Sequence, residues 1–241
     1  MNLPCKELKR IARTNLSGHF STPMGVYLIA GLVPLLVELP FSMLQKEQQP
    51  LPMTIMFYIA DFLIVLLSYV LSAGVCRTHL AIARKQTGRL KMVFFGFQNR
   101  PDRYILAGLF LALLCVAGIL PAALGILYLY KKGACVETVT VLVILSVISL
   151  LVTALLQLSY SLLLFCITDH EEQRIPEAIR SCRQLMKGHR GRLLYLYLSF
   201  IGLQLLGIIS FGIGSLWVEP YRSQTLANFY LNIKGEMINT L

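Results

Sequence analysis

The sequence predicts an all-α membrane protein, a polytopic bundle of transmembrane helices. First, 56% of its 241 residues are hydrophobic and only 14% are charged, whereas a soluble domain carries about 25% charged residues. Second, the apolar residues form long, nearly uncharged blocks that match the roughly 20 residues a helix needs to cross a bilayer. Third, Lys and Arg gather in alternate segments between the blocks, as the positive-inside rule requires.

Six apolar segments follow one another along the chain, and we expect about six membrane helices. The first four lie at about 24–44, 53–76, 104–130 and 139–165, and each is long enough to span. The last two are shorter, at about 193–211 and 215–233, and a glycine-rich stretch separates them. The sixth contains Glu219, Pro220 and Arg222, so it predicts either a crossing or a helix lying in the interface.

The distribution of basic residues predicts a cell-membrane protein with both termini in the cytoplasm. With the N-terminus inside, eighteen Lys and Arg face the cytoplasm and three face outward. The net charge of +10 can indicate nucleic acid or an anionic membrane surface. Because the basic residues lie between apolar blocks, we expect membrane lipids with anionic headgroups as partners and no nucleic acid. A second copy of the chain or another protein is a further class of partner that remains open.

Two segments on the predicted cytoplasmic side have the pattern of basic amphipathic helices. In 175–187 the apolar residues recur at helical spacing, Pro176 suits the first turn, and Gly188 suits the end. Residues 5–17 behave similarly, and 90–97 contains a shorter apolar stripe. We expect these helices to lie on the membrane surface. Their basic residues at that surface would be Arg10, Arg13, Arg180, Arg183 and Lys187.

The two amphipathic segments align at a constant offset of 170 residues. The matched pairs are Glu7 and Glu177, Arg10 and Arg180, Arg13 and Arg183, Gly18 and Gly188, and His19 and His189. We interpret residues 1–241 as a single transmembrane domain of three repeat units, 1–76, 77–168 and 169–241, each a surface helix followed by a transmembrane hairpin. The alternative is that basic amphipathic helices resemble each other through composition alone.

Four ionisable residues lie within the predicted membrane segments, where a charge is costly and therefore suggests function. They are Glu38, Asp61, Glu219 and Arg222. The predicted topology puts the three acids in the outer half of the bilayer, where they could line an outward-opening pocket for a cation, a proton or a cationic ligand. In the alternative, Glu219 pairs with Arg222 three residues later, Glu38 reaches the headgroups, and Asp61 pairs with Arg222.

Motifs for catalysis, cofactors or metals are weak or missing in the sequence. His170 begins a zincin-like stretch that lacks the second histidine. The four histidines lie beside predicted cytoplasmic boundaries, and we interpret them as interfacial polar residues: His19, His79, His170 and His189. The six cysteines form no CxxC pair and behave as small apolar residues. We therefore predict no catalytic residue, cofactor or metal site.

Several stretches resemble the DUF975 family of bacterial, mainly Gram-positive, membrane proteins. They are 6–9 near the N-terminus, 186–190 with the apolar run to 206, and 212–221 with 227–230. The resemblance implies a multi-helix membrane protein with no assigned activity. That family is distantly similar to the membrane domain of some glycerophosphodiester phosphodiesterases, but this chain has no room for their catalytic domain. Glu38 and Asp61 match no motif of the family.

Two classes of function follow from these patterns. The first is a non-enzymatic membrane protein that binds or moves a small ligand, or that supports a membrane assembly through its basic surface helices. The second is a membrane-embedded enzyme that acts on lipid headgroups. A cavity with two or more acids and a histidine would favour the enzyme. A cavity lined by Glu38, Asp61 and Glu219 alone would favour binding or transport.

Overall fold

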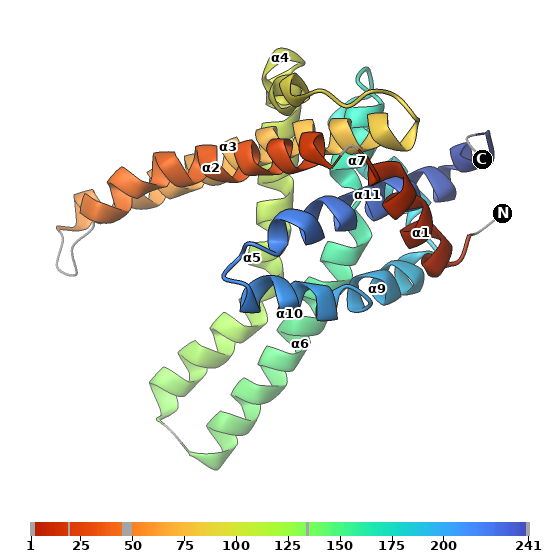
Figure 1. Cartoon of the computed structure of the whole chain (residues 1–241). Coiled ribbons are helices and arrows are strands. Elements are labelled where there is room, and N and C mark those ends of the chain that lie inside the picture. Colours follow the sequence, from red (N-terminus) through yellow and green to blue (C-terminus); the bar gives the residue numbers. More distant parts are fainter. Residues whose placement is uncertain (1–2, 19, 45–49, 134, 240–241) are drawn as a thin grey trace. The chain divides into compact units, whose positions relative to one another are not determined.

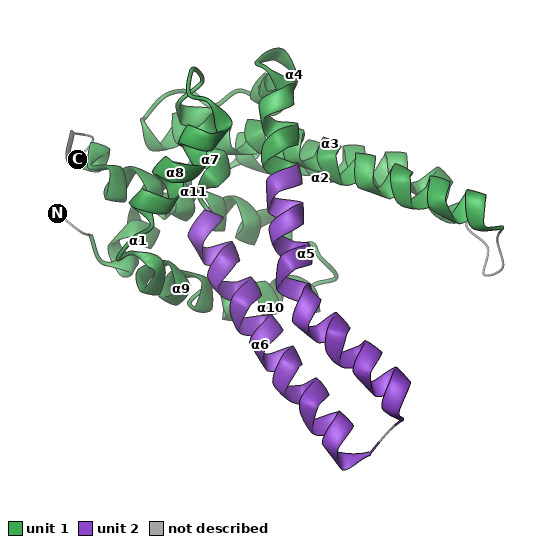
Figure 2. Ribbon diagram, turned by 180° about the vertical axis from the view of Figure 1, so that it is seen from behind, with its two compact units in different colours: residues 1–108, 162–241 green, residues 109–161 purple. Residues whose placement is uncertain are grey.

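The computed structural model describes residues 3–18, 20–44, 50–133 and 135–239, and all regular structure within these ranges is helical. This confirms the predicted all-α class. The chain divides into two compact units (Figure 2). Unit 1 comprises residues 1–108 and 162–241, and unit 2 comprises residues 109–161.

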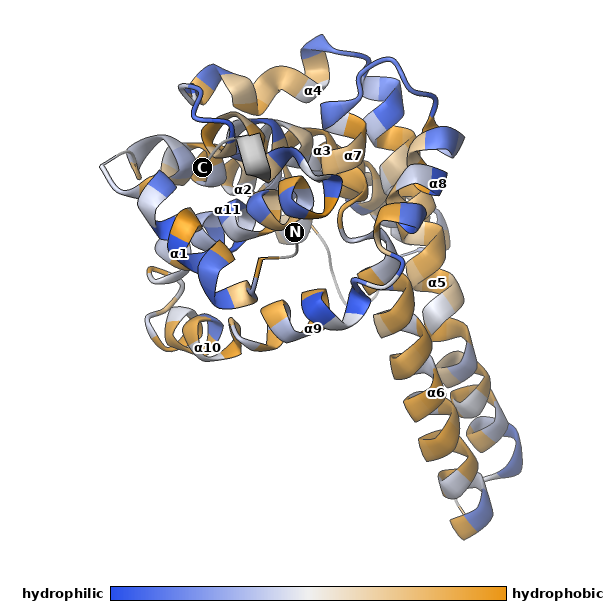
Figure 3. Ribbon diagram, turned by 90° about the vertical axis from the view of Figure 1, so that its right-hand side faces the viewer, coloured by the Kyte–Doolittle hydropathy of each residue, from blue (hydrophilic) through white to orange (hydrophobic). Residues whose placement is uncertain are grey.

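Five helical stretches are long and apolar enough to cross a membrane. They are Ser21–Leu44 (α2), Leu51–Ala83 (α3), Pro101–Lys132 (α5), Val136–Asp169 and Arg190–Ile209. The fourth joins α6 (Val136–Tyr160) to α7 (Leu163–Asp169), and the fifth joins α9 (Arg190–Leu198) to α10 (Ile201–Ile209). Many of their large apolar side chains are exposed, and Figure 3 shows hydrophobic residues along most of α6. Such surfaces fit a membrane protein, because lipid can cover what protein does not.

Unit 2 is a hairpin formed by the later part of α5 and by α6. The hydroxyl of Ser149 donates a hydrogen bond of 2.5 Å to the carbonyl of Gly118 on the facing helix. A Cβ atom at Gly118 would lie 2.2 Å from the Thr153 hydroxyl. The two helices therefore approach so closely that only a glycine fits at this position.

Three helices form the centre of unit 1: the C-terminal part of α3, α7, and α11 (Ser215–Lys234). α3 packs against both α7 and α11. Phe165 of α7 stacks on Tyr230 of α11, with ring centres 6.0 Å apart. The sixth predicted segment therefore forms a helix, but α11 is not among the five apolar stretches. Residues 223–232 are buried within the protein.

The polar side chains of α11 explain its inner position. Ser223, Gln224 and Asn228 are buried by contacts of α11 with α1, α2 and α3. A helix with polar groups on every side is unstable against lipid, whereas a protein interior can supply hydrogen-bond partners. α11 thus carries the chain back to the ends of α3 and α7, where Lys234 meets Asp169.

Each short amphipathic segment packs on one of these three inner helices. α1 (Cys5–Leu16) packs on α11, η1 (Leu90–Phe94) and α4 (Phe95–Gln98) on α3, and α8 (Ile175–Leu185) on α7 (Figure 1). The helices predicted at 5–17 and 175–187 are confirmed. Their apolar faces contact protein rather than lipid, because a neighbouring helix removes the same apolar area from water. The fully buried residues are Leu8, Ala12 and Leu16 on α1, and Ala178, Cys182 and Met186 on or after α8.

Candidate functional site

The four ionisable residues predicted inside membrane segments lie in two places within unit 1. Glu38 on α2 and Asp61 on α3 are exposed on the hairpin that these two helices form. Glu219 and Arg222 form an ion pair of 2.7 Å along α11. This is the pairing that the structural alternative predicts for Glu219. Among the ion pairs of the described residues, none joins Asp61 to Arg222.

The five basic residues predicted at the membrane surface are all exposed. Arg10 and Arg13 lie on α1, whereas Arg180 and Arg183 lie on α8 and Lys187 follows it. Arg10 pairs with Glu7 one turn earlier. Because the apolar faces of α1 and α8 are buried, the surfaces that these helices present outward are basic.

A cavity of about 460 Å³, here named the α1 cavity, opens beside the first helix. Lys9 lines it and donates a hydrogen bond of 2.9 Å to the carbonyl of Ser199, with its ammonium 4.0 Å from the centre of the Phe200 ring. Burial lowers the pKa of Lys9. The lining residues are Pro4, Lys6, Glu7, Lys9, Arg10, Arg13 and Tyr221.

The charges in the α1 cavity do not balance. Its one carboxylate, Glu7, pairs with Arg10. No ion pair between described residues involves Lys6 or Arg13. Burial raises the pKa of Tyr221, and the Arg13 charge acts against that shift. Lys6, Lys9 and Arg13 therefore have no carboxylate partner in the cavity, and beside a neutral phenol they suit an anionic group.

A second feature, the ion cluster, ties the ends of the three inner helices. It comprises Arg84 after α3, Asp169 at the end of α7, Lys234 at the end of α11, and Glu236. Arg84 contacts Asp169 and Glu236, each at 2.6 Å. Lys234 contacts Asp169 at 2.6 Å and Glu236 at 2.5 Å. The two cations and two carboxylates thus form a closed ring.

The electrostatics of the ion cluster favour its charged form. Burial alone would raise the pKa of Glu236, but hydrogen bonds from Lys234 and Arg84 lower it overall. Burial alone would lower the pKa of Lys234, but hydrogen bonds to Asp169 and Glu236 raise it overall. The phenol of Tyr230 donates a further hydrogen bond of 3.0 Å to Asp169. Since every charge has opposite partners, the cluster fits a structural role.

A buried polar contact links α3 to α11 and was not foreseen from the sequence. The Nδ1 atom of His79 lies 2.8 Å from the Gln224 carboxamide oxygen. The Gln224 carboxamide nitrogen donates a hydrogen bond of 3.3 Å to the His79 carbonyl. His79 is fully buried, rather than interfacial as the sequence suggested. The signal that could have identified this contact is the run of polar residues around all sides of 223–232.

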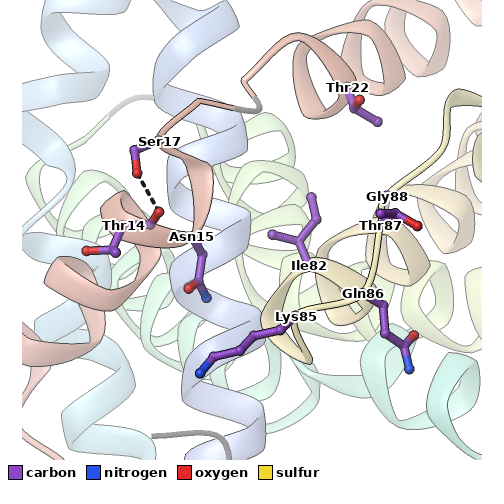
Figure 4. A pocket seen from close by; sticks show the side chains of 9 residues that line it. All are labelled: Thr14, Asn15, Ser17, Thr22, Ile82, Lys85, Gln86, Thr87 and Gly88. Atoms are coloured by element: carbon purple, nitrogen blue, oxygen red, sulfur yellow. Dashed lines mark hydrogen bonds between the residues drawn. The ribbon is translucent and has the colours of Figure 1, made fainter.

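A third feature, here named the α3 cavity, has a volume of about 420 Å³. Figure 4 shows its lining side chains, which come from the end of α1, the beginning of α2, and the end of α3 with the loop after it. They are Thr14, Asn15, Ser17, Thr22, Ile82, Lys85, Gln86, Thr87 and Gly88. Most of its lining residues carry polar side chains, one of them is a lysine, and none is a site residue predicted from the sequence.

Comparisons with known proteins identify a family but no characterised relative. No curated protein matches the chain, and no solved structure matches it. Residues 1–237 match the family described as a protein of unknown function, DUF975. Because this match covers nearly the whole chain, as the sequence resemblance predicted, the protein belongs to the DUF975 family.

Proposed function

We propose that this protein is a non-enzymatic membrane protein whose cytoplasmic face binds anionic phospholipid headgroups at the α1 cavity. The observation that carries the proposal is the charge imbalance in that cavity, where Lys6 and Arg13 have no carboxylate partner among the described contacts. A phosphate group could accept hydrogen bonds from both cations. The exposed basic face of α8 would add weaker attraction to the same membrane surface.

The proposed orientation has both termini in the cytoplasm. It is supported by the contacts of the ion cluster, which join the ends of α3, α7 and α11 on one side of unit 1. The adjoining loops are among the segments richest in Lys and Arg. An alkaline phosphatase fused after residue 46 should be active outside the membrane, and one fused after residue 87 should be inactive. The reverse pattern would contradict the orientation.

Lipid binding can be measured with the purified full chain in neutral detergent micelles. Fluorescent phosphatidylglycerol should bind more tightly than fluorescent phosphatidylcholine in anisotropy titrations, and added salt should weaken only the former. The double variant Lys6→Gln, Arg13→Gln should lose about tenfold or more in phosphatidylglycerol affinity, because each cation near an anionic surface contributes about 1 kcal/mol.

A matched control removes the same charge elsewhere. Arg89 and Lys91 are exposed and do not line the α1 cavity. The variant Arg89→Gln, Lys91→Gln should keep the wild-type affinity within about twofold. If both double variants weaken phosphatidylglycerol equally, or if wild type binds both lipids equally, the proposed site is wrong.

We also propose the three-unit organisation, 1–76, 77–168 and 169–241, within one transmembrane domain. It is supported by the cyclic packing of the surface helices, in which α1 contacts α11, η1 and α4 contact α3, and α8 contacts α7. The buried positions of α1 and α8 also correspond at the offset of 170, and Gly18 and Gly188 share a positive φ. His19 lies outside the described residues. Failure of residues 20–44 to superpose on 190–214 in an experimental structure would contradict the repeat.

A role for the intramembrane acids in moving a cation is a second proposal. It is supported by the exposure of Glu38 and Asp61 on helices that are otherwise apolar, since charge in such a place requires a reason. In proteoliposomes, Asp61→Asn should abolish cation uptake while leaving the melting temperature unchanged. Leu63→Ala, at another exposed position of α3, is the control. Uptake by Asp61→Asn at the wild-type rate would exclude the role.

A further inference from the structure

The α3 cavity contains polar groups that have no partner within the protein. Asn15, Lys85 and Gln86 make no side-chain hydrogen bond or ion pair within the described ranges, and neither do Thr22 and Thr87. Asn15 and Thr22 are half-buried, so their polar atoms are only partly available to bulk water. The other polar lining residues are exposed, and a concave surface with unused hydrogen-bonding capacity can take a polar ligand.

The charge of the cavity selects for an anion. Lys85 alone is ionisable among the described residues that line it. It lies at the C-terminal end of α3 with a φ of 60°, in the left-handed region where glycine is preferred. The amide of Gln86 donates a hydrogen bond of 2.8 Å to the carbonyl of Ala81, which closes the helix end. This turn fixes the backbone of Lys85, whose exposed side chain lines the cavity.

Two hydroxyl groups of the cavity already donate their protons within the protein. Thr14 donates its hydroxyl proton to the Arg10 carbonyl at 3.1 Å, and Ser17 donates its proton to the Thr14 carbonyl at 2.6 Å. These two oxygens therefore offer only acceptor positions to a ligand. The carboxamides of Asn15 and Gln86 can both donate and accept. A ligand that uses all of them needs hydrogen-bond donors, such as hydroxyl groups, as well as a negative charge.

Another cavity of unit 1, of about 340 Å³, provides an internal comparison. This cavity lies between the start of α5 and the loop after α7. The α3 cavity has a similar position, between the start of α2 and the loop after α3. In this cavity the guanidinium of Arg103 is already bonded within the protein, because it donates hydrogen bonds to the carbonyls of His170, Glu171 and Gln173. The two glutamates in its lining would also repel an anion. Of the two cavities, only the α3 cavity suits an anionic ligand.

We propose that the α3 cavity binds a small phosphorylated polyol, with the phosphate against Lys85 and the hydroxyl groups against Asn15, Gln86 and Thr14. The cavity volume of about 420 Å³ is of the size that ligand pockets occupy. The source of this chemistry is either a soluble sugar phosphate or the headgroup of an inositol lipid. The site is separate from the α1 cavity, and the proposal does not depend on lipid binding there.

The test uses the full chain in phosphatidylcholine nanodiscs and isothermal titration calorimetry with glucose 6-phosphate. We expect saturable binding, weaker binding of inorganic phosphate, and no binding of glucose at the same concentrations. Lys85→Gln should lower the affinity about tenfold, as expected for the loss of one charge-assisted hydrogen bond. Lys85→Gly should fold at least as well as wild type, because glycine tolerates the positive φ, and should show the same loss.

Two controls separate this site from its surroundings. Lys91→Gln removes a nearby exposed lysine that does not line the cavity, and should bind like wild type. Lys6→Gln, Arg13→Gln should also bind glucose 6-phosphate like wild type, whereas Lys85→Gln should keep phosphatidylglycerol binding. Nanodiscs that contain phosphatidylinositol should block the sugar phosphate if the lipid headgroup is the natural source, and should leave it unchanged if the source is soluble.

Several results would overturn the proposal. These are no detectable heat with glucose 6-phosphate at millimolar concentration, equal affinity for inorganic phosphate, or equal weakening by Lys85→Gln and Lys91→Gln. The first result would show that there is no site, the second that the hydroxyl groups contribute nothing to binding, and the third that Lys85 acts only through general surface charge.

Discussion

Replacing Asp169 with asparagine should strongly destabilise unit 1, because this carboxylate joins the ends of all three inner helices. It contacts Arg84 from α3 and Lys234 from α11, each at 2.6 Å, and accepts a hydrogen bond from Tyr230. Its side chain is only 4% exposed, compared with 28% for Arg84 and 21% for Lys234. The substitution keeps the shape of the side chain and removes its charge.

The expected size of the effect follows from this burial. Breaking a buried ion pair costs about 3–5 kcal/mol, because the remaining charge loses its partner without regaining water. Arg84 and Lys234 are partly exposed and keep Glu236 as a partner, so we expect the lower limit, about 3 kcal/mol. For a chain of this size that corresponds to a fall of about 6–12 °C in melting temperature. Glu236→Gln should cost only about 1 kcal/mol, because Glu236 is 37% exposed.

Thermal unfolding in detergent micelles, followed by circular dichroism, measures both variants under the same conditions. The reasoning requires Asp169→Asn to melt clearly below Glu236→Gln, and Glu236→Gln to melt slightly below wild type. It would be refuted if Asp169→Asn melted within about 2 °C of wild type, or if the order of the two variants were reversed.

Three further predictions use other contacts. Gly118→Ala should lower the melting temperature of the protein, because its Cβ would lie 2.2 Å from a hydroxyl of α6, whereas Gly31→Ala, with open space, should not lower it. Gln224→Leu should cost about 1–3 kcal/mol in chemical unfolding, because it leaves the buried His79 without its partner, and Gln224→Glu should retain part of that stability. Burial opposes ionisation of Glu236, but hydrogen bonds from Lys234 and Arg84 outweigh it and hold the pKa of Glu236 below 4.5. The Glu236 carboxylate therefore stabilises the folded protein fully at neutral pH, and this stabilisation is lost as the pH falls through its folded-state pKa. The melting difference between wild type and Glu236→Gln should therefore be largest at pH 7 and shrink steadily as the solution is made more acidic than the ordinary pKa of a glutamate.

Hydropathy predicted the long apolar helices well because it responds to their length and apolar character alone. α2, α3, α5 and the stretch of α6 with α7 are apolar over lengths that match the hydrocarbon thickness, so the segments at 24–44, 53–76, 104–130 and 139–165 fall within them. The amphipathic segments were also predicted as helices, because an apolar stripe of period 3.6 appears whether the stripe contacts lipid or protein. Whether the stripe contacts lipid or protein depends on residues far away in the sequence, and the local pattern holds no information about them.

The position of α11 could not be obtained in this way. Its polar residues cover every side, so the helix has no periodic stripe and too little apolar character for a membrane span. They are compensated by contacts such as that of Gln224 with His79, which lies 145 residues earlier. The ion cluster was missed for a related reason. Arg84, Asp169 and Lys234 look like ordinary boundary charges until α3, α7 and α11 converge.

The packing of the first helix on the last one has a consequence for how the protein is made. α1 ends at Leu16, whereas its main partner, α11, begins only at Ser215. Synthesis at about 5–20 residues per second makes the interval between them on the order of ten seconds or longer. During that time Leu8, Ala12 and Leu16 lack the α11 surface that α1 packs on in the folded protein, and the headgroup region of the membrane is a substitute for it. α1 would thus rest on the bilayer in the nascent protein and leave it only when the chain is finished, which makes docking of α1 the closing step of assembly.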